Sequence, residues 1–322
     1  MKGLLVSAIA MVMWAARPAL AGPFDGNWIG QIPPSGPCHV TATMTITVSG
    51  NVLSGVMHNS ANAAPFKGTV DANGNAAFTT EKGHPGTIKF TADRFDANWT
   101  SGGCHRHSLG DRAPDATQTT ALLAQRLQAQ TTYDDLTAKA AAGDRSVDFT
   151  LLRSSYPFTK HWDPDGTTIA PILEQAKVAA NGKDCATALE KLDEVLKTDY
   201  TIIIAHRVRS DCLKGDAARI ESRIADGLTH SLTHGGNGKS EASAYPVMTG
   251  HEETDILADQ DIVLKARDVA VRGSDGRFYD VVHGLSVRNG LRLQDVYFDV
   301  SAQVQGRNSA MAAADAVTAR LP

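Results

Sequence analysis

The first third of the chain alternates between apolar and polar residues with the period of two that is typical of strands. The segment VTATMTITV at 40–48 places apolar side chains on one face and threonines on the other. Glycine- and asparagine-rich turns separate several such segments, and no helical pattern lies between them. This pattern predicts an all-β module over residues 22–110, folded as a small antiparallel barrel or sandwich with Trp28 and Trp99 in its core. The predicted strands are 27–31, 40–48, 52–58, 66–70, 76–80, 87–91, 95–99 and 105–109.

The period changes to that of a helix in the middle of the chain. Gly182 and Gly215 end two of the predicted helices and lie 33 residues apart, close to the tetratricopeptide repeat of about 34 residues. The segment 182–199 resembles the second helix of such a repeat, so we expect tetratricopeptide-like helical hairpins. Four consecutive helices are predicted, which begin near Pro171, Asp184, Thr201 and Asp216.

The period of two returns near the end of the chain. Segments 262–271, 277–287 and 291–300 predict a three-stranded antiparallel meander, with Asn289-Gly290 as a tight hairpin between the last two strands. This meander and the helices predict a multi-domain protein with an α+β module over 131–302. Residues 111–130 are polar and contain a proline, which indicates a linker with a short helix over 121–130. Residues 303–322 are expected to form a flexible tail.

The first 21 residues have the features of a secretory signal peptide. Lys2 precedes an apolar run, and Ala19-Leu20-Ala21 is a small-residue cleavage site. We therefore expect a periplasmic or secreted protein with no membrane span in its mature part. The formal net charge of −4 disfavours nucleic acid as a partner, because phosphate binding needs a basic surface.

The four cysteines allow three pairings in an oxidising compartment. Pairing within each module is the simplest, which predicts the disulfides Cys38–Cys104 and Cys185–Cys212. Cys185 and Cys212 are almost equidistant from the turn between two antiparallel helices, so they should lie opposite each other. We expect both bridges to be structural, because no C-x-x-C pair is present.

Residues 132–301 resemble an uncharacterised bacterial family of exported proteins, the domain of unknown function 4919. Asn237 stands where the family usually has Asp, and Thr254 stands where an aromatic residue is common. The resemblance implies a fold and export but no activity, and the β module lies outside it. The matching motifs are TYDDL at 132–136, GDRSVDF at 143–149, Leu152-Arg153, Ala205-His206, GNGKS at 236–240, AYPV at 244–247, Glu252-Glu253 and YFDV at 297–300.

The glycine-rich segment 233–240 is close to a phosphate-binding loop but lacks its first glycine and follows a helix instead of a strand. We therefore expect no nucleotide and no cofactor. The favoured function is non-catalytic: binding of a peptide, a protein or an envelope component by the helical face and the turn at 234–253. The residues expected to bind are Gly238, Lys239, Ser240, Tyr245, Glu252 and Glu253.

The alternative function is a metal-dependent or acid/base hydrolase. Imidazole and carboxylate groups can bind zinc or transfer protons, and the i, i+4 spacing of His230 and His234 puts both on one helix face. A hydrogen-bonded core histidine is the favoured interpretation of His206, which is surrounded by apolar residues. In the β module, His105 and His107 share one strand face, but no third metal ligand is evident. The hydrolase would be centred on His206, His230, His234 and Glu252, with Lys239 as a further catalytic candidate.

Overall fold

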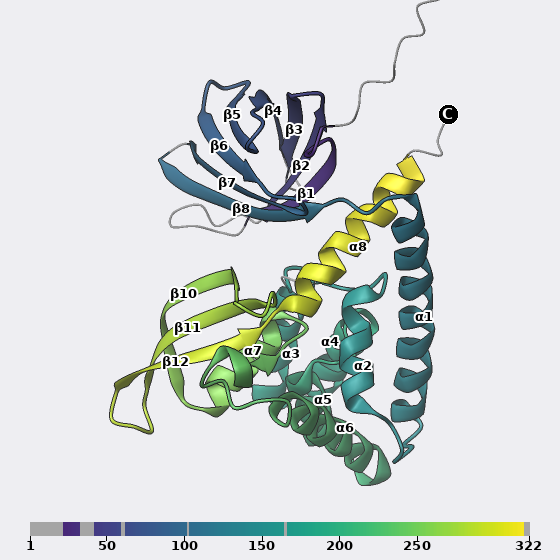
Figure 1. Cartoon of the computed structure of the whole chain (residues 1–322). Helices are drawn as coiled ribbons and strands as arrows, with labels where there is room; N and C mark the ends of the chain where they lie inside the picture. Colours follow the sequence, from purple (N-terminus) through teal and green to yellow (C-terminus); the bar gives the residue numbers. More distant parts are fainter. Residues whose placement is uncertain (1–21, 33–41, 59–61, 102, 164–165, 319–322) are drawn as a thin grey trace, which may run out of the picture. The chain divides into compact units, whose positions relative to one another are not determined.

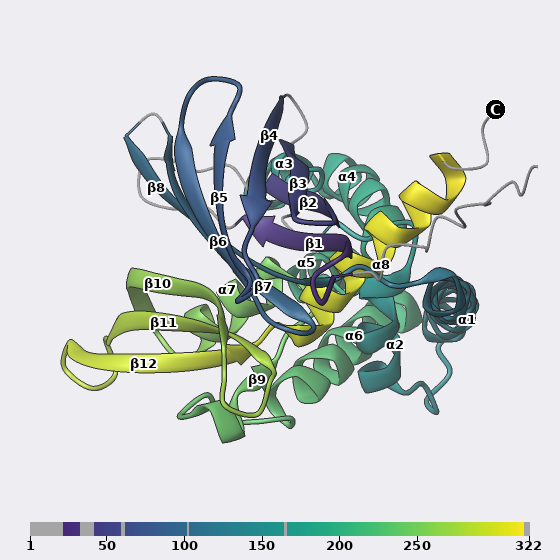
Figure 2. The same cartoon turned by 45° about the horizontal axis from the view of Figure 1, so that its top comes forward.

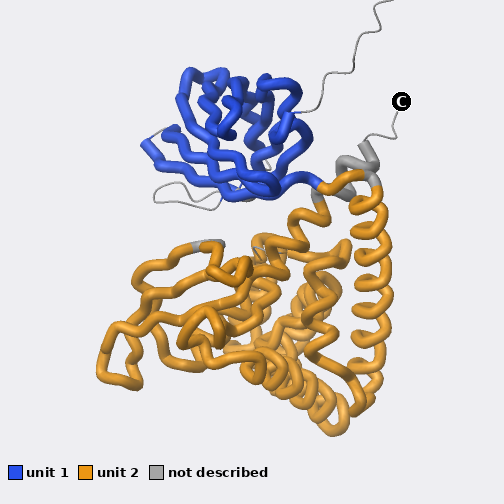
Figure 3. The backbone as a smooth tube through the Cα atoms, viewed as in Figure 1, with its two compact units in different colours: residues 1–113 blue, residues 114–322 orange. Residues whose placement is uncertain are grey.

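The structure of the protein is a computed structural model that describes residues 22–32, 42–58, 62–101, 103–163 and 166–318. The chain divides into two compact units, residues 1–113 and residues 114–322 (Figure 3). The predicted signal peptide, residues 1–21, lies outside the described residues and stays a prediction. None of the helices in the described ranges is long and apolar enough to cross a membrane.

Unit 1 is a closed barrel of eight antiparallel strands, so the barrel is the correct one of the two predicted architectures (Figure 1). Each strand pairs with its neighbour in sequence, and β1 also pairs with β8, which closes the ring. The side chains alternate between the interior and solvent, as the period of two requires. The strands are β1 (Gly26–Ile32), β2 (Ala42–Ser49), β3 (Val52–His58), β4 (Ala63–Val70), β5 (Asn75–Thr80), β6 (Pro85–Phe90), β7 (Arg94–Ser101) and β8 (Cys104–Arg112).

Two glycines allow the barrel to close around an aromatic ring. Gly30 of β1 faces Gly110 of β8 across the closing seam. A Cβ atom on Gly30 or Gly110 would lie 2.6 or 2.2 Å from the ring of Phe95, which is too close for any side chain. The buried rings of Trp28 and Trp99 belong to the same apolar core, as the sequence predicts.

Unit 2 combines helices with a second sheet (Figures 1 and 2). The sheet has four strands in the order β10-β11-β12-β9. The predicted three-stranded antiparallel meander is present as β10, β11 and β12, but the sheet is larger than predicted, because a fourth strand adds to β12. The additional strand, β9, has only two residues and pairs in parallel with β12, and a two-residue strand leaves no periodicity in the sequence. The strands are β9 (Tyr245–Pro246), β10 (Ile262–Arg272), β11 (Phe278–Ser286) and β12 (Arg292–Asp299).

The helices of unit 2 surround one face of this sheet. Apolar side chains of α1, α2, α6 and α7 share a core with inward-facing residues of β10, β11 and β12. Thr249 caps α7 through a hydrogen bond that its side chain accepts from the backbone of Glu252. The helices are α1 (Ala116–Ala141), α2 (Phe149–Ser155), α3 (Ala170–Asn181), α4 (Cys185–Thr198), α5 (Ile203–Cys212), α6 (Gly215–Thr233), α7 (Gly250–Asp259) and α8 (Ser301–Thr318), with short 3-10 turns η1 (Tyr156–Phe158) and η2 (Glu241–Ser243).

The tetratricopeptide-like stack is a wrong prediction. In such a stack each repeat contacts only its neighbours, whereas α6 contacts α1, α2 and β9 as well as α5. Helices α3, α4 and α5 share a small apolar cluster of their own, but the apolar face of α6 is buried in the main core of unit 2. The repeat-like glycine spacing therefore reflects helix lengths and not a solenoid, and the apolar face of α6 is not available as a binding surface.

Two further segments differ from their predictions. The predicted linker 111–130 holds the end of β8 and half of α1, which Asp115 and Gln118 begin as a capping box. The predicted flexible tail 303–322 is helical as far as Thr318, and α8 packs against α1. Arg126 of α1 donates a hydrogen bond of 3.0 Å to the hydroxyl of Ser309 in α8. The alanine-rich composition favours this helix, and contacts from α1 hold it in place.

The predicted bridge between Cys185 and Cys212 is confirmed. Their sulfurs are 2.26 Å apart, and the bond joins the start of α4 to the end of α5. Cys104 is buried at the start of β8, but Cys38 lies outside the described residues. The Cys38–Cys104 pairing therefore stays a prediction.

Replacement of both Cys185 and Cys212 by serine should destabilise unit 2 by about 3 kcal/mol, because the open chain gains the entropy of a loop of 27 residues. Urea denaturation followed by circular dichroism measures this change. The wild-type protein with an added reductant should show the same loss, and an unchanged unfolding midpoint in both would contradict a stabilising bridge.

Candidate functional site

A buried ion pair joins α2 to α7. Arg153 donates two hydrogen bonds to the carboxylate of Glu252, from Nε at 2.6 Å and from Nη2 at 2.8 Å. The two side chains are only 2% and 3% exposed. Arg153 also donates to the carbonyl of Pro246 at 2.8 Å, and Glu252 accepts a bond from the backbone N–H of Met248 at 2.7 Å. Glu252, a predicted binding residue, is therefore fully occupied within the protein.

A second buried ionic group lies beside it, between α7 and the sheet. The guanidinium of Arg267 in β10 contacts the carboxylates of both Glu253 and Asp280. Both carboxylates are buried, with side chains only 3% and 4% exposed. Burial, together with the charge of Asp280, raises the pKa of Glu253 to about 8. Glu253 is therefore protonated at neutral pH, and it acts in the structure of unit 2.

Two further aspartates titrate near neutral pH. Asp199 is fully buried at the end of α4, where its Oδ1 accepts bonds from the backbone N–H and the hydroxyl of Thr201 at 2.7 and 2.6 Å. Burial raises the pKa of Asp199 to about 7, and burial also raises the pKa of Asp255 in α7 to about 7. Perturbed carboxyls often mark active sites, but buried ionic networks perturb pKa values as well.

His206 is a core histidine, as favoured from its apolar neighbours. Its Nδ1 lies 2.6 Å from the carboxylate of Glu221, and its Nε2 lies 2.8 Å from the carbonyl oxygen of Tyr200. Glu221 also accepts a bond of 2.7 Å from Arg209. Burial works to raise the pKa of Glu221, but the bonds from His206 and Arg209 outweigh it and leave that pKa below its ordinary value. Both ring nitrogens of His206 are thus occupied inside the fold.

The turn after α6 is held by its own backbone. The backbone N–H groups of Asn237 and Gly238 both donate to the carbonyl of Ser243 at 2.8 Å. Gly238 has a φ of +68° and packs against the ring of Tyr245, so a side chain would not fit there. The phenol oxygen of Tyr245 accepts a bond of 2.8 Å from Gln260. Of the predicted binding residues, Lys239 and Ser240 are exposed, and the other four are buried.

The candidate metal ligands do not assemble into a site. The rings of His230 and His234 lie side by side at the exposed end of α6, with their centroids 4.5 Å apart. Within the described ranges, no three histidine, cysteine, aspartate or glutamate side chains are grouped so that they could hold a metal ion. His206, Glu252 and Lys239, the proposed catalytic residues, have separate partners on different elements. The arrangement gives no support to the hydrolase.

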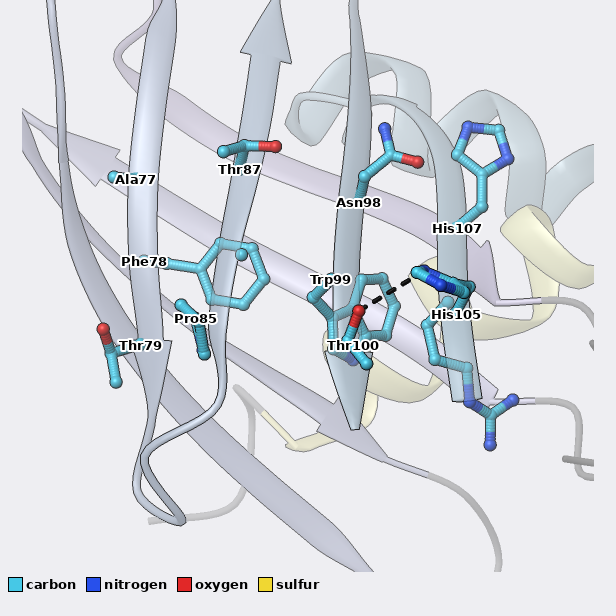
Figure 4. Close-up of a pocket in the computed structure, with 12 residues that line it drawn as sticks. Ala77, Phe78, Thr79, Pro85, Thr87, Asn98, Trp99, Thr100, His105 and His107 are labelled. Carbon is cyan, nitrogen blue, oxygen red and sulfur yellow. Dashed lines mark hydrogen bonds between the residues drawn. The ribbon is translucent and has the colours of Figure 1, made fainter. Parts of the chain in front are cut away.

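A hollow lies on the barrel, across strands β5 to β8 (Figure 4). It has a volume of about 660 Å³, within the range of small-ligand sites. Thr87, Asn98 and His107 lie side by side on β6, β7 and β8, because the strand register pairs each with the next (Figure 4). A second row holds Thr100 and His105, whose side chains are 3.3 Å apart. The lining consists of Ala77, Phe78, Thr79, Pro85, Gly86, Thr87, Asn98, Trp99, Thr100, His105, Arg106 and His107.

Short side chains create this hollow above an aromatic layer. Phe78 and Trp99 are buried beneath the exposed row, and Gly86 leaves space for the ring of Phe78, which a Cβ atom would meet at 2.2 Å. Asp96 accepts hydrogen bonds from the Asn98 amide at 2.7 Å and lies 3.1 Å from His107 Nε2, which fixes both side chains. The hollow therefore offers oriented amide, hydroxyl and imidazole groups.

The sequence did not predict the hollow or the buried ion pair of Arg153, a residue singled out only as part of a motif in the family resemblance. The alternating pattern places Thr87, Asn98 and His107 on the solvent face of their strands, but it does not give the register that sets them side by side. An arginine five residues after the N-cap Asp148 of a short helix has no periodicity that would mark it as half of a buried ion pair. No protein-family model, curated protein or solved structure matches this chain. The resemblance to the domain of unknown function 4919 therefore stays a prediction.

Removal of one partner of the Arg153–Glu252 ion pair should lower the unfolding free energy more than removal of both partners. Glu252→Gln leaves the Arg153 guanidinium without its counter-charge, and we expect a loss of about 3–5 kcal/mol of unfolding free energy. The double variant Arg153→Met, Glu252→Leu should recover much of this loss, because it removes both charges. Chemical denaturation of the three proteins checks the order, and a double variant that is less stable than Glu252→Gln would contradict it.

Protein stability should fall as the pH rises towards 8. The folded-state pKa values of Asp199, Glu253 and Asp255 lie above the ordinary carboxyl values, so the folded protein holds protons that the unfolded chain releases. Their contribution is complete below about pH 4 and is lost progressively as the pH rises from about 4 to between 7 and 8, because over this range only the unfolded chain releases the protons.

The variant Asp199→Asn isolates one of these groups. Its amide oxygen can accept the Thr201 bonds without a charge, so the decline in unfolding free energy between pH 5 and pH 8 should become shallower. Urea titrations at several pH values measure this slope. Asp226→Asn, a change at an exposed position of α6, should keep the wild-type slope. An identical slope in wild type and Asp199→Asn would show that Asp199 is not the group that titrates.

Proposed function

We propose that this protein is an exported, non-catalytic binding protein whose ligand occupies the hollow on β5 to β8. Export is supported by the signal-peptide pattern at 1–21 and by the Cys185–Cys212 bridge, because disulfides persist in oxidising compartments. The observation that carries the binding function is the hollow itself. It combines a volume of about 660 Å³ with exposed polar groups that point outward from three neighbouring strands.

The chemistry of the lining favours a neutral ligand with many hydroxyl groups. Thr79, Thr87 and Thr100 contribute hydroxyls, Asn98 contributes an amide, and His105 and His107 contribute imidazoles. These groups both donate and accept hydrogen bonds. The lining contains no carboxylate and no lysine, and Arg106 is its one permanent cation. An oligosaccharide segment of the cell envelope has the matching chemistry, since its hydroxyls and acetamido groups also donate and accept.

The turn at 234–253 is a weaker candidate for the same function. Glu252 is paired with Arg153 and Glu253 contacts Arg267 inside the fold, and Gly238 and Tyr245 are packed against each other. Lys239 and Ser240 remain exposed, but the Ser240 hydroxyl is already hydrogen-bonded to that of Ser243 at 3.0 Å, so the turn offers few free polar groups to a ligand. The concentration of oriented groups on the barrel therefore supports binding there.

Titration of the mature chain with chitotetraose, a soluble N-acetylglucosamine oligomer, and with solubilised peptidoglycan fragments tests this function. We expect a saturable signal in isothermal titration calorimetry with at least one of the two probes. Thr87→Arg should reduce the affinity at least tenfold, because the long side chain would occupy part of the hollow and add a charge to it.

Ser54→Arg is the matched control, since Ser54 is an exposed hydroxyl residue on strand β3, away from the residues that line the hollow. Its affinity should equal that of the wild type. Absence of saturable binding to both probes, or equal binding by Thr87→Arg, would contradict a ligand site for glycans in the hollow.

A further inference from the structure

Exposed aliphatic side chains gather at one end of the sheet in unit 2. Ten large hydrophobic side chains are exposed among the described residues, and six of them lie between residues 263 and 293. Five of the six belong to one end of the sheet, where β10 begins and where β11 turns into β12. We call this group the apolar tip. It consists of Val263, Leu264, Val287, Leu291 and Leu293.

The strand register brings part of the apolar tip into a single row. Val263 of β10 pairs with Leu285 of β11, and Leu285 pairs with Leu293 of β12. These residues lie on the face of the sheet opposite to the buried side chains of Val282 and Val296, because successive residues point to opposite faces. Leu293 is 78% exposed, so the core of unit 2 does not cover the end of this row.

The turn between β11 and β12 extends the row. The backbone N–H of Leu291 donates to the carbonyl of Ser286 at 2.8 Å, which leaves a loop of residues 287–291 in place of a two-residue hairpin. Leu291 has a φ of +63°, a conformation that branched side chains disfavour, and its side chain is 61% exposed. Figures 1 and 2 show this turn projecting beyond the helices of unit 2.

Basic side chains surround the apolar tip. Arg288 donates to the carboxylate of Asp261 at 2.7 Å and to the carbonyl of Asp259. Lys265 and Arg292 are exposed and form no hydrogen bond or ion pair within the described ranges. The tip therefore combines aliphatic side chains with two exposed cations, while the nearby Asp261 is paired with Arg288 and Asp295 with His283.

We propose that the apolar tip docks on the surface of an anionic lipid bilayer. The aliphatic side chains would enter the boundary between headgroups and acyl chains, and Lys265 and Arg292 would lie against anionic headgroups. Exposed apolar patches mark interaction sites in soluble proteins. The charges favour a bilayer over a second copy of the chain, because self-association through this patch would bring the same cations together. Such peripheral docking needs no membrane-spanning helix.

Vesicle co-sedimentation of the mature chain tests this proposal. We expect binding to vesicles of phosphatidylethanolamine with 30% phosphatidylglycerol, and at least tenfold weaker binding to pure phosphatidylcholine vesicles. The double variant Leu291→Asp, Leu293→Asp should reduce binding to the anionic vesicles at least tenfold. Lys265→Ala with Arg292→Ala should also weaken it and should reduce its dependence on salt.

Two control proteins keep the test specific. Leu127→Asp with Val178→Asp changes two exposed aliphatic residues on α1 and α3, and it should bind as the wild type does. Leu291→Gly removes one side chain of the tip while it fits the positive φ, so this variant should fold normally and still bind more weakly. Thermal unfolding by circular dichroism checks the fold of every variant.

Three results would overturn the proposal. The first is absence of binding to anionic vesicles. The second is equal binding by the wild type and the Leu291→Asp, Leu293→Asp variant. The third is a dimer in analytical ultracentrifugation without lipid that this variant abolishes, because the tip would then be an interface between two copies of the chain.

Discussion

The organisation of unit 2 depends on the bidentate ion pair between Arg153 and Glu252. A guanidinium inside an apolar core is unfavourable unless every donor is satisfied, so its neighbours are tightly constrained. Arg153 reaches a carboxylate from α7, a carbonyl from β9 and a hydroxyl from α6, which fixes these elements relative to α2. The position of the α7 helix in turn places Glu253 against Arg267 and Asp280 of the sheet. The acidic residues that resembled an active site are thus the means by which helices and sheet are joined.

Over its described residues, the barrel of unit 1 is held together by apolar packing and not by buried ion pairs. Its interior is apolar and aromatic, and it contains no buried ion pair among the described side chains. Close packing of Phe95 on the glycine seam and of Phe78 on Gly86 replaces directional polar contacts. The polar groups are consequently directed outward, where a row of short side chains leaves space above the strands. Unit 2 therefore buries ionic side chains in pairs inside its fold, whereas unit 1 exposes its polar side chains on the outer face of the barrel.

The periodicity of apolar residues was sufficient to predict most of the strands and helices, but not how they pack together. The eight strands of unit 1 follow from alternation and turns, and the Cys185–Cys212 bridge follows from the equal distance of both residues from a turn. The extent of α1 could not be predicted, because this helix exposes much of its surface and has almost no apolar face. The short strand β9, the ion-pair partners of Arg153 and the row across Thr87, Asn98 and His107 all depend on register and tertiary contact. A single sequence does not contain these distances.

The pairing of β1 with β8 has a consequence for the order of folding. The first strand finds its second partner only after residue 109 has been made, so the ring cannot close until nearly all of unit 1 has been made. Contacts between such distant residues form slowly, because a long loop must be ordered first. Until that pairing forms, β1 and β8 each have an open edge that could pair with another chain, and closure of the ring removes both edges at once.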